Sequence, residues 1–315
     1  MKKSSIFVFS LSFALVLNLF SCTVDDEGRV LAYNIDRGGK PKVPSDGVTV
    51  IKSLSELPSF HGGNSKVVTH KLKNGEVNYT VEFDKDKQAT RWVAFQMNSH
   101  NVFGNIPRYG KTEGKGKSKT NYLFDPSFSS TEFLKDLIKG SGYSHGHLIA
   151  SADRKSDEEA QKQTFYLTNM APQIQNSFNA SPGAWALMEE LVRSKFREAI
   201  NVSNIDTMFV VRGCTIDNLD QIKENVRGLI VPKYFYSLQV LKYKDINGKW
   251  SYKALSFWIE HKKSDARGQM KTFLKPIREI EKLTGINFFA RFSKEDQDYF
   301  ENMTSEQMAV MWNIK

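Results

Sequence analysis

The sequence has few of the residues that dominate fibrous, disulfide-rich or disordered proteins. Its 315 residues include 2 cysteines, 9 prolines and 20 glycines, and 25% of them are charged. These numbers exclude a disulfide scaffold, a collagen-like repeat and a wholly disordered chain. Hydrophobic residues make up 40%, so a chain of this length can bury a core, in one large domain or two smaller ones, without disulfide or metal support.

Acidic residues are too few to balance the basic ones. Lys and Arg total 44 and Asp and Glu total 35, which gives a formal net charge of +9 and a pI near 9.3. A basic protein can bind an anionic partner such as a nucleic acid or a lipid surface. Charge alone does not identify that partner.

A long apolar run, residues 6–20, follows Lys2 and Lys3 and predicts a signal peptide over residues 1–21. The run ends at Cys22 in Leu-Phe-Ser-Cys, which resembles the lipobox of bacterial lipoproteins, so Cys22 is the predicted lipidation site. A plain secretory signal is the alternative. Acidic residues 25–27 resemble the signal that exports some lipoproteins to the cell surface. We therefore expect an outer membrane lipoprotein exposed at the cell surface, with a periplasmic or secreted protein as the alternative.

The mature chain divides into an irregular arm and a folded region. Residues 22–64 are rich in Gly, Ser, Pro and charge, which predicts a tether, and residues 65–315 form the predicted domain. Apolar alternation over residues 67–95 indicates antiparallel strands. Residues 235–243 and 252–259 flank Asn247-Gly248, which predicts a hairpin. The mixture of hairpins and scattered helices favours an α+β fold, with a central, mostly antiparallel sheet flanked by helices.

Two helices and one loop are predicted from local patterns. Ser181 and Pro182 are suitable residues for the cap and first turn of a helix over residues 181–199. A second helix is expected over about residues 275–283, where Gly285 follows its end. Residues 108–120 carry one arginine and four lysines among glycines, which predicts an exposed loop.

His145 and His147 lie two residues apart in a strand-like stretch. On a strand they would point to the same side and could bind zinc, although no third histidine or cysteine ligand lies at a recognisable spacing. A pair of ordinary core or edge histidines is another interpretation. The histidines alone leave these alternatives open.

The residues that follow His147 carry a resemblance to a known family. Residues 164–173 read Thr-Phe-Tyr-Leu-Thr-Asn-Met-Ala-Pro-Gln, followed by Phe178-Asn179, Trp185 and Glu189. This order resembles the DNA/RNA non-specific endonuclease family of the ββα-metal (His-Me finger) superfamily, in which an Asp-Arg-Gly-His motif precedes such a loop and helix. Further matches extend the resemblance over residues 67–292. It implies a ββα-metal finger active site within residues 65–315.

The resemblance assigns a role to each motif position. His147 would activate water, since an imidazole titrates near working pH. Asn179 would ligate a hydrated Mg²⁺, with Mn²⁺ or Ca²⁺ as alternatives. Glu189 would orient a metal-bound water, Arg193 would contact a phosphate oxygen, and Asn169 would position the histidine or the phosphate. A surface ion pair of Glu189 with Arg193, and purely structural asparagines, are the alternatives.

The chain departs from the family pattern at three places. Ser144 and His145 stand where the family has Asp and Arg, so the predicted substrate contacts there lack a permanent cation. The stretch between Asn179 and the helix is about two residues longer than is common in the family. Arg91 lies near the place of the family's upstream substrate arginine, in an uncertain register.

These features predict an enzyme that hydrolyses DNA and RNA without sequence preference, since contacts to backbone phosphates carry little sequence information. Histidine-activated water and one Mg²⁺ would leave 5′-phosphates. A catalytically weak nucleic-acid-binding surface lipoprotein of the same fold is the main alternative, and a zinc hydrolase using His145 and His147 is a third.

Overall fold

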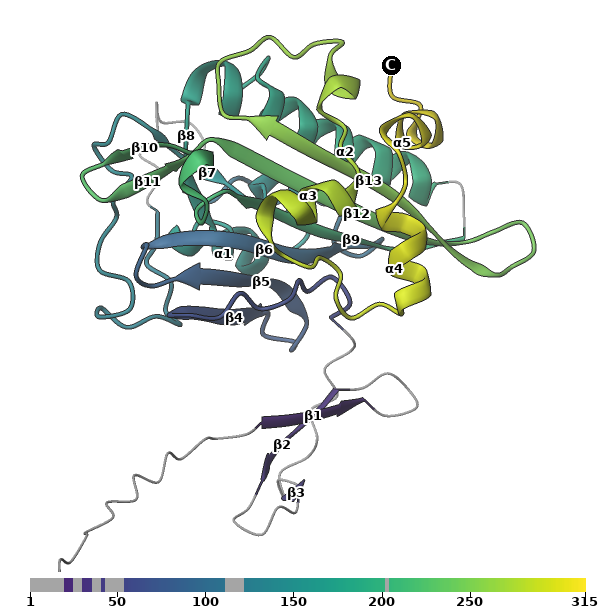
Figure 1. The fold of residues 1–315 in the computed structure, drawn as a ribbon, viewed down its shortest axis with the longest axis horizontal. Helices are drawn as coiled ribbons and strands as arrows, with labels where there is room; N and C mark the ends of the chain where they lie inside the picture. The colour runs from purple at the N-terminus through teal and green to yellow at the C-terminus, as the bar shows by residue number, and fades with distance from the viewer. Residues whose placement is uncertain (1–19, 25–29, 36–40, 43–53, 111–121, 202–203) are drawn as a thin grey trace, which may run out of the picture. The chain divides into compact units, whose positions relative to one another are not determined.

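The computed structural model describes residues 20–24, 30–35, 41–42, 54–110, 122–201 and 204–315 (Figure 1). The chain forms two compact units, Met1–Leu54 and Ser55–Lys315, and the second is called the main body below. The first unit holds a small antiparallel sheet of β1 (Phe20–Val24), β2 (Val30–Ile35) and β3 (Pro41–Lys42). Most of the predicted signal peptide, and the side chain of Cys22, lie outside the described residues.

The main body begins at Ser55, so the segment before residue 65 contributes to it. Glu56 and Leu57 are buried there. The short strands β1 to β3 occur where the composition predicted no regular structure, with β2 paired antiparallel to both β1 and β3. No helix in the described part of the chain is long and apolar enough to cross a membrane.

A six-stranded sheet forms the centre of the main body, in the order β13-β12-β9-β6-β5-β4. Every neighbouring pair in this sheet is antiparallel, which confirms the predicted α+β fold with a central antiparallel sheet. Its strands are β4 (Ser65–Lys71), β5 (Val77–Asp84), β6 (Ala89–Met97), β9 (Ile205–Cys214), β12 (Tyr234–Lys244) and β13 (Trp250–Glu260).

The predicted hairpin is formed by β12 and β13. The two strands stay in register from Tyr234 opposite Glu260 to Lys244 opposite Trp250. Gly248 has φ of +74°, a left-handed conformation that a residue without a Cβ adopts at no steric cost. The Asp245 backbone N–H donates to the Lys249 carbonyl and closes the loop at 2.8 Å.

The helix α2 (Ala184–Ile200) packs one apolar stripe into the core. The stripe consists of Trp185, Met188, Val192 and Phe196, all fully buried. The helix begins later than predicted, because its N-cap is Gly183 and Ser181 makes no side-chain cap. A Cβ at Gly183 would lie 2.2 Å from the Phe178 backbone nitrogen, so only glycine fits at this position.

Shorter elements complete the main body. The predicted helix near residue 280 is α3 (Ile277–Thr284), ended by Gly285 in the left-handed conformation as expected. The other α-helices are α1 (Glu158–Gln163), α4 (Lys294–Glu301) and α5 (Ser305–Trp312). The small sheets and short turns are β7 (Ser144–His147) with β8 (Met170–Gln173), β10 (Ile222–Val226) with β11 (Leu229–Pro232), η1 (Ser151–Asp153), η2 (Leu167–Asn169), η3 (Gln175–Asn179), η4 (Leu219–Gln221) and η5 (Met270–Phe273).

Candidate active site

Strands β7 and β8 pair antiparallel and lead into α2, which gives a ββα unit. His147 lies opposite Met170 and Ser144 lies opposite Gln173. Gly146 allows this pairing, because a Cβ there would lie 2.1 Å from the Gln173 Cδ atom. The Trp185 indole on α2 donates to the His147 carbonyl oxygen at 3.2 Å, so the helix fixes the end of β7.

The His147 ring is buried and neutral. It packs edge-on against Phe165, with 5.0 Å between ring centroids. Burial, together with the positive charges of Arg108 and His145, lowers the pKa of His147 to about 3. Its Nε2 atom is buried and has no hydrogen-bond partner. The ring is therefore able to accept a proton from a molecule that enters the site.

Arg108 is a site residue that the sequence placed only in an exposed loop. Its guanidinium lies over the Phe165 ring at 4.8 Å and donates to the Ser151 hydroxyl. The charge acts on both His147 and Glu189. Arg108 thus supplies a permanent cation whose charge acts on His147. No spacing rule connects residues 108 and 147, because only the fold brings them together.

Glu189 and Arg193 belong to a buried group that we call the Asp153 cluster. Arg193 donates to Asp153 Oδ1, and Arg212 donates to Asp153 Oδ2 at 2.9 Å. Arg212 Nη1 also lies 3.8 Å from Glu189 Oε1. The cluster therefore consists of Asp153, Glu189, Arg193 and Arg212. Arg193 thus pairs with a buried aspartate, unlike the surface pair with Glu189 that was the alternative.

The charges in the Asp153 cluster are not fully balanced. Burial raises the pKa of Glu189 to about 7, although Arg212 acts against the shift. Burial alone would also raise the pKa of Asp153, but Arg212 and Arg193 hold that pKa below its usual range. Glu189 Oε1 and Arg212 Nη2 are buried without hydrogen-bond partners. Such orphaned atoms indicate a place for water, an ion or a substrate group.

Asn169 holds the backbone that follows His147. Its side-chain oxygen accepts from the Ile149 N–H at 2.9 Å, and its amide donates to the carbonyls of Ile149 and Thr164. The residue is fully buried. Of the predicted roles, this geometry favours positioning of His147 through the adjoining backbone.

Asn179 ends the turn η3 and lies against the start of β7. Its amide nitrogen donates to the Ser144 hydroxyl at 3.3 Å and to Gln175 Oε1 at 3.2 Å. In the described hydrogen bonds its side-chain oxygen has no donor. No described hydrogen bond or ion pair joins Asn179 to His147: Asn179 lies against Ser144 at the start of β7, and His147 is the last residue of that strand.

Ser144 and His145, the predicted substrate contacts, are engaged by the protein itself. The Ser144 hydroxyl donates to the Gln173 carbonyl at 2.8 Å. The His145 Nε2 atom lies 2.9 Å from both oxygens of Asp136, and its ring stacks on Tyr122 with centroids 4.0 Å apart. A carboxylate therefore occupies the position where the predicted phosphate contact was expected.

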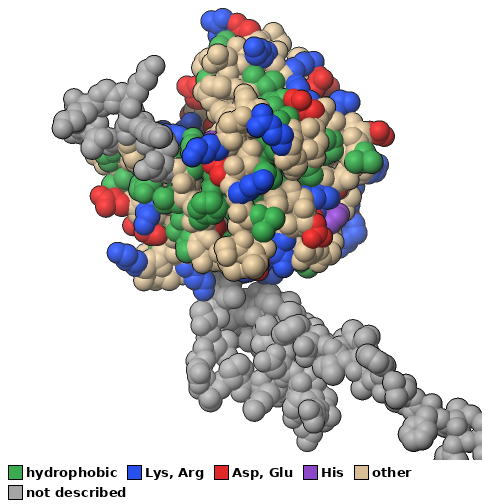
Figure 2. All heavy atoms as spheres, turned by 90° about the vertical axis from the view of Figure 1, so that its left-hand side faces the viewer, with side chains coloured by type: hydrophobic (Ala, Val, Ile, Leu, Met, Phe, Trp, Pro, Cys, Tyr) green, Lys and Arg blue, Asp and Glu red, His purple; other side chains and the backbone are tan. Residues whose placement is uncertain are grey.

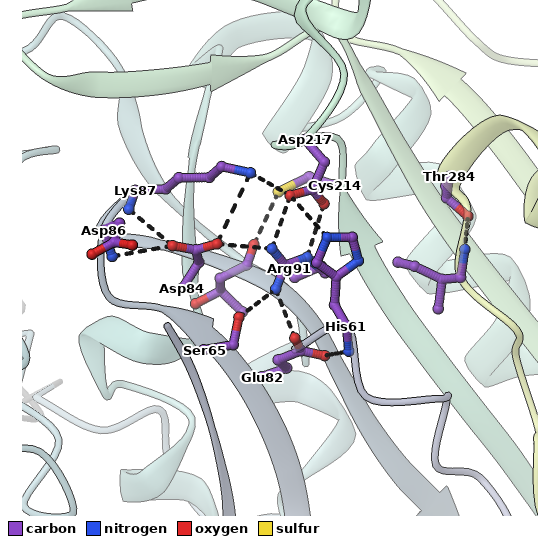
Figure 3. A network of polar contacts seen from close by, with 12 residues as sticks. His61, Ser65, Glu82, Asp84, Asp86, Lys87, Arg91, Cys214, Asp217 and Thr284 are labelled. Atoms are coloured by element: carbon purple, nitrogen blue, oxygen red, sulfur yellow. Dashed lines mark hydrogen bonds and ion pairs between the residues drawn. The ribbon is translucent and has the colours of Figure 1, made fainter. Parts of the chain in front are cut away.

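Arg91 is not a substrate residue. It is 1% exposed at the centre of what we call the Arg91 cluster, with Glu82, Asp84 and Asp217 (Figure 3). Its guanidinium donates to Glu82 at 2.7 Å, to Asp84 at 2.8 Å and to both oxygens of Asp217 at 2.8 Å. Three carboxylates surround this cation, so it has no position left for a phosphate.

The donor set fits a hydrated hard cation better than zinc. Among the described residues no group of three or more His, Cys, Asp or Glu side chains could hold a metal. A zinc site takes at least three such side chains, so the zinc alternative has no support in this part of the chain. The free oxygen of Asn179 can serve as one ligand of a cation that keeps most of its water, as Mg²⁺ does.

Figure 2 shows the side of the molecule that is on the left in Figure 1. Lys and Arg side chains are spread over it between Asp and Glu side chains and do not form one continuous patch. Binding of a nucleic acid to this side would depend on individual cations more than on one continuous positive patch.

Two antiparallel strands and a helix around a buried histidine define a ββα-metal fold. The family model of the DNA/RNA non-specific endonucleases matches residues 62–295, so the chain belongs to that family. It is 25% identical over 224 residues to mitochondrial nuclease EXOG of Mus musculus, covering 69% of this chain and 56% of that protein. It is 28% identical over 221 residues to mitochondrial endonuclease G of Homo sapiens, covering 69% of each.

A solved structure supports the same fold. The crystal structure of the EndoG/EndoGI complex superimposes with a TM-score of 0.55 at 20% sequence identity, covering 74% of this chain and 89% of that chain. The chain spans little more than half the length of the EXOG relative. The comparisons therefore establish the family and the ββα-metal fold.

Proposed function

We propose that this protein is a metal-dependent endonuclease that hydrolyses phosphodiester bonds of DNA and RNA and leaves 5′-phosphates. The observation that carries the proposal is the buried His147 ring, whose Nε2 atom has no hydrogen-bond partner and which shares the Phe165 ring as a neighbour with the Arg108 cation. Membership of the DNA/RNA non-specific endonuclease family supports the same substrate class.

His147 is the general base. Its neutral ring accepts the proton of a water molecule, and the oxygen of that water attacks the phosphorus. A phosphodiester beside His147 brings a negative charge, which raises the pKa of the ring from about 3 toward the working pH. Asn169 maintains the ring position through the backbone of residue 149.

Asn179 would hold one hydrated Mg²⁺ through its side-chain oxygen, with Mn²⁺ or Ca²⁺ as alternatives. When bound, the ion would stabilise the negative charge that develops on the phosphoryl oxygens and on the departing 3′ oxygen. Ser144 and Gln175 orient the amide by accepting its two N–H groups, which leaves the oxygen available.

The cations around His147 position the substrate. Arg108, whose guanidinium lies over the Phe165 ring, would contact a non-bridging phosphate oxygen, and Arg193 adds a second fork from α2. Glu189 would orient a water molecule of the site. These contacts involve the sugar–phosphate backbone, so we expect little dependence on base sequence.

Cleavage of plasmid DNA and of RNA by the purified protein tests the proposal. With Mg²⁺ present, His147→Ala should reduce the rate by about 100-fold or more, the usual contribution of a general base, and a chelator should abolish cleavage. His100→Ala removes an exposed histidine outside the site and is the matched control. Unchanged cleavage in His147→Ala would contradict the assignment of the base.

The replacement of Asp-Arg by Ser144 and His145 favours one alternative, a catalytically weak nucleic-acid-binding protein of the same fold. The engagement of His145 by Asp136 adds to this argument, since it removes a cation from the substrate side. Tight binding of DNA or RNA by the protein without any cleavage in Mg²⁺, Mn²⁺ or Ca²⁺ would support that alternative.

We also propose that Cys22 is lipidated and attaches the protein to the outer membrane, exposed at the cell surface. The residues that support this are Lys2, Lys3, the apolar run 6–20 and the acidic residues 25–27. Incorporation of labelled fatty acid into the wild-type protein but not into Cys22→Ser would test it. Protease added to intact cells would then separate surface exposure from a periplasmic position.

A further inference from the structure

The β12–β13 hairpin extends past the rest of the sheet (Figure 1). Pairing of β12 with β9 ends at Tyr243 opposite Ile205, and from there the two hairpin strands pair with each other as far as Lys244 and Trp250. We call residues 242–253 the hairpin tip. Its surface therefore faces solvent on more than one side.

The hairpin tip combines exposed apolar side chains with lysines. Ile246 is 100% exposed and Trp250 is 44% exposed. The twelve residues contain one acidic side chain and four lysines, which are Lys242, Lys244, Lys249 and Lys253. A single exposed isoleucine needs no explanation, but an exposed isoleucine and an exposed tryptophan together with four lysines on one projecting loop suggest a contact with a partner.

Local ion pairs do not neutralise most of this charge. Asp245 accepts the backbone N–H groups of Asn247 and Lys249 at 2.9 Å and so shapes the turn. Lys242 pairs with Asp206 at 3.3 Å. In the described ion pairs the other three lysines of the hairpin tip have no carboxylate partner, so they remain available to anionic groups.

The arrangement around Trp250 favours a lipid surface over a nucleic acid. The ammonium groups of Lys242 and Lys244 lie 4.3 and 5.2 Å from the centre of the Trp250 ring, where a stacked base would have to compete with them. The hairpin tip has no arginine to grip phosphates with two parallel hydrogen bonds. An exposed isoleucine beside tryptophan and lysine is instead suited to the boundary between lipid headgroups and acyl chains.

The hairpin tip is also remote from the candidate active site. Phe235, near the start of β12, packs against Trp185 with ring centroids 5.3 Å apart. Nine residue steps separate Phe235 from Lys244, a length of about 30 Å. A surface bound at the hairpin tip would therefore leave the β7–β8 end accessible to substrate.

The first residues of the main body lie on the half of the central sheet that is nearer to the hairpin tip. Glu56 accepts a hydrogen bond from Gln96 at 2.8 Å. Gln96 is paired with Phe209, and Phe209 is paired with Val240, two residues before the hairpin tip. Glu56, near the start of the main body, therefore lies on the half of the sheet that leads to the hairpin tip.

We propose that the hairpin tip is a docking surface for a bilayer with anionic phosphate headgroups. Ile246 and Trp250 enter the headgroup region, and Lys244, Lys249 and Lys253 contact the phosphates. This contact does not depend on nuclease activity and does not require an acyl chain on Cys22. Its function is to hold the main body at the membrane with the candidate active site directed away from it.

Vesicle binding by the mature chain carrying Cys22→Ser, which lacks any acyl chain, tests the proposal. The chain should sediment with phosphatidylcholine vesicles that contain phosphatidylglycerol, and less with phosphatidylcholine alone or in high salt. Lys244→Gln with Lys249→Gln should lower the partition coefficient roughly 10- to 30-fold. Ile246→Ser should lower it roughly tenfold.

Matched controls change the same chemistry elsewhere on the surface. Lys271→Gln with Lys282→Gln removes two exposed lysines, and Val310→Ser removes an apolar side chain that is 81% exposed. Neither should change vesicle binding. Circular dichroism and thermal unfolding establish that every variant is folded.

The result that would overturn the proposal is equal binding of all variants to anionic vesicles, or no binding at all. Loss of DNA binding by the hairpin variants with unchanged vesicle binding would assign the surface to nucleic acid and would also overturn it. Cleavage of free DNA without vesicles is measured in parallel. If that cleavage is absent in the wild type, the proposed nuclease function fails while the vesicle result still stands.

Discussion

The molecule contains two buried clusters built around arginine, and they differ in how completely their polar groups are paired. In the Arg91 cluster all five guanidinium N–H groups are used, toward Glu82, Asp84, Asp217 and Ser65. In the Asp153 cluster, Arg212 Nη2 and Glu189 Oε1 have no hydrogen-bond partner. Arginine offers five donors in a fixed plane, so this difference reflects the arrangement of its acceptors.

The comparison separates a structural cluster from a functional one. A fully paired buried network rigidifies the fold, whereas a network with orphaned atoms is costly unless something else enters it. The Arg91 cluster ties β5 and β6 to residue 217. In the Asp153 cluster, Arg212 donates to the carbonyl of Leu148, the residue after His147, at 3.3 Å, and two polar atoms are left for water or substrate. Each cluster should therefore respond differently to mutation.

The largest effect is expected for Arg91→Met. Removing the guanidinium leaves Glu82, Asp84 and Asp217 without their common cation, and breaking a buried ion pair costs about 3–5 kcal/mol of unfolding free energy. Urea denaturation measures the loss. The cleavage rate per folded molecule should stay near that of the wild type, because Arg91 contacts no residue of the candidate active site.

Arg267→Met is the control for this experiment. Arg267 forms an exposed pair with Asp265, and exposed pairs contribute little to stability. Its urea midpoint should be close to that of the wild type. A stable Arg91→Met protein with strongly reduced cleavage would reverse the assignment and make the Arg91 cluster functional.

Glu189→Gln should lose activity and keep its stability, the opposite of Arg91→Met. Cleavage should fall roughly 100-fold, because the carboxylate that orients water is lost. Burial raises the pKa of Glu189 to about 7, above the ordinary value of 4.5, so its contribution to stability is complete below pH 4.5 and is lost as the pH rises through 7. The variant should therefore gain thermal stability relative to the wild type at pH 8 but not at pH 4.5.

Glu190→Gln provides the comparison, since Glu190 is the exposed neighbour on α2. It should cleave normally and show no such change between the two pH values. A Glu189→Gln protein that is destabilised at pH 8 would show that the carboxylate is a stabilising member of a paired network.

A smaller effect is expected from His261, which supports the turn before Asn179. Its Nε2 accepts the Ile174 N–H at 2.9 Å and its Nδ1 donates to the Pro232 carbonyl. Burial lowers the pKa of His261 to about 4, so stability is complete above pH 6.5 and is lost as the pH falls toward 4. His147, with a pKa of about 3, adds to this loss.

The unfolding temperature, measured between pH 7 and pH 4, reports this loss of stability in acid. His261→Gln loses the packing and exact geometry of the ring, so the variant should unfold at a lower temperature than the wild type at pH 7. Because glutamine does not become charged in acid, its unfolding temperature should decrease less between pH 7 and pH 4. An equally steep decrease in His261→Gln would assign the acid sensitivity to other groups.

The sequence predicted the elements whose patterns are local. The apolar stripe of α2, the Asn247-Gly248 turn and the strand β5 were each predicted from residues a few positions apart, and the structure confirms these elements. The order of His147, Asn169, Asn179 and Glu189 could be recognised because the family resemblance preserves it. Exact boundaries were less accurate, as the later start of α2 shows, because close packing of Gly183 against Phe178 was not visible.

Contacts between distant segments could not be predicted in this way. Arg108 reaches His147 from a loop that looked merely solvated, and Asp136 reaches His145 across a stretch without regular structure. Arg91 had the right charge near the right place, but its three carboxylates come from β5 and from residue 217. Charge and spacing do not reveal which cation is already neutralised.

The smallest effect is expected at Asp136, which decides whether His145 can meet a phosphate. Asp136→Asn removes the charge that holds the His145 ring and would repel a nucleic-acid backbone, so KM for DNA should fall about two- to fivefold, in the range of one weak phosphate contact. The decrease should be greater at 50 mM than at 150 mM salt, while kcat changes little. Asp220→Asn removes an exposed charge on η4 and controls for net charge alone. A raised KM in Asp136→Asn would mean that the aspartate positions His145 productively, and the paired His145 would then be the binding-competent form.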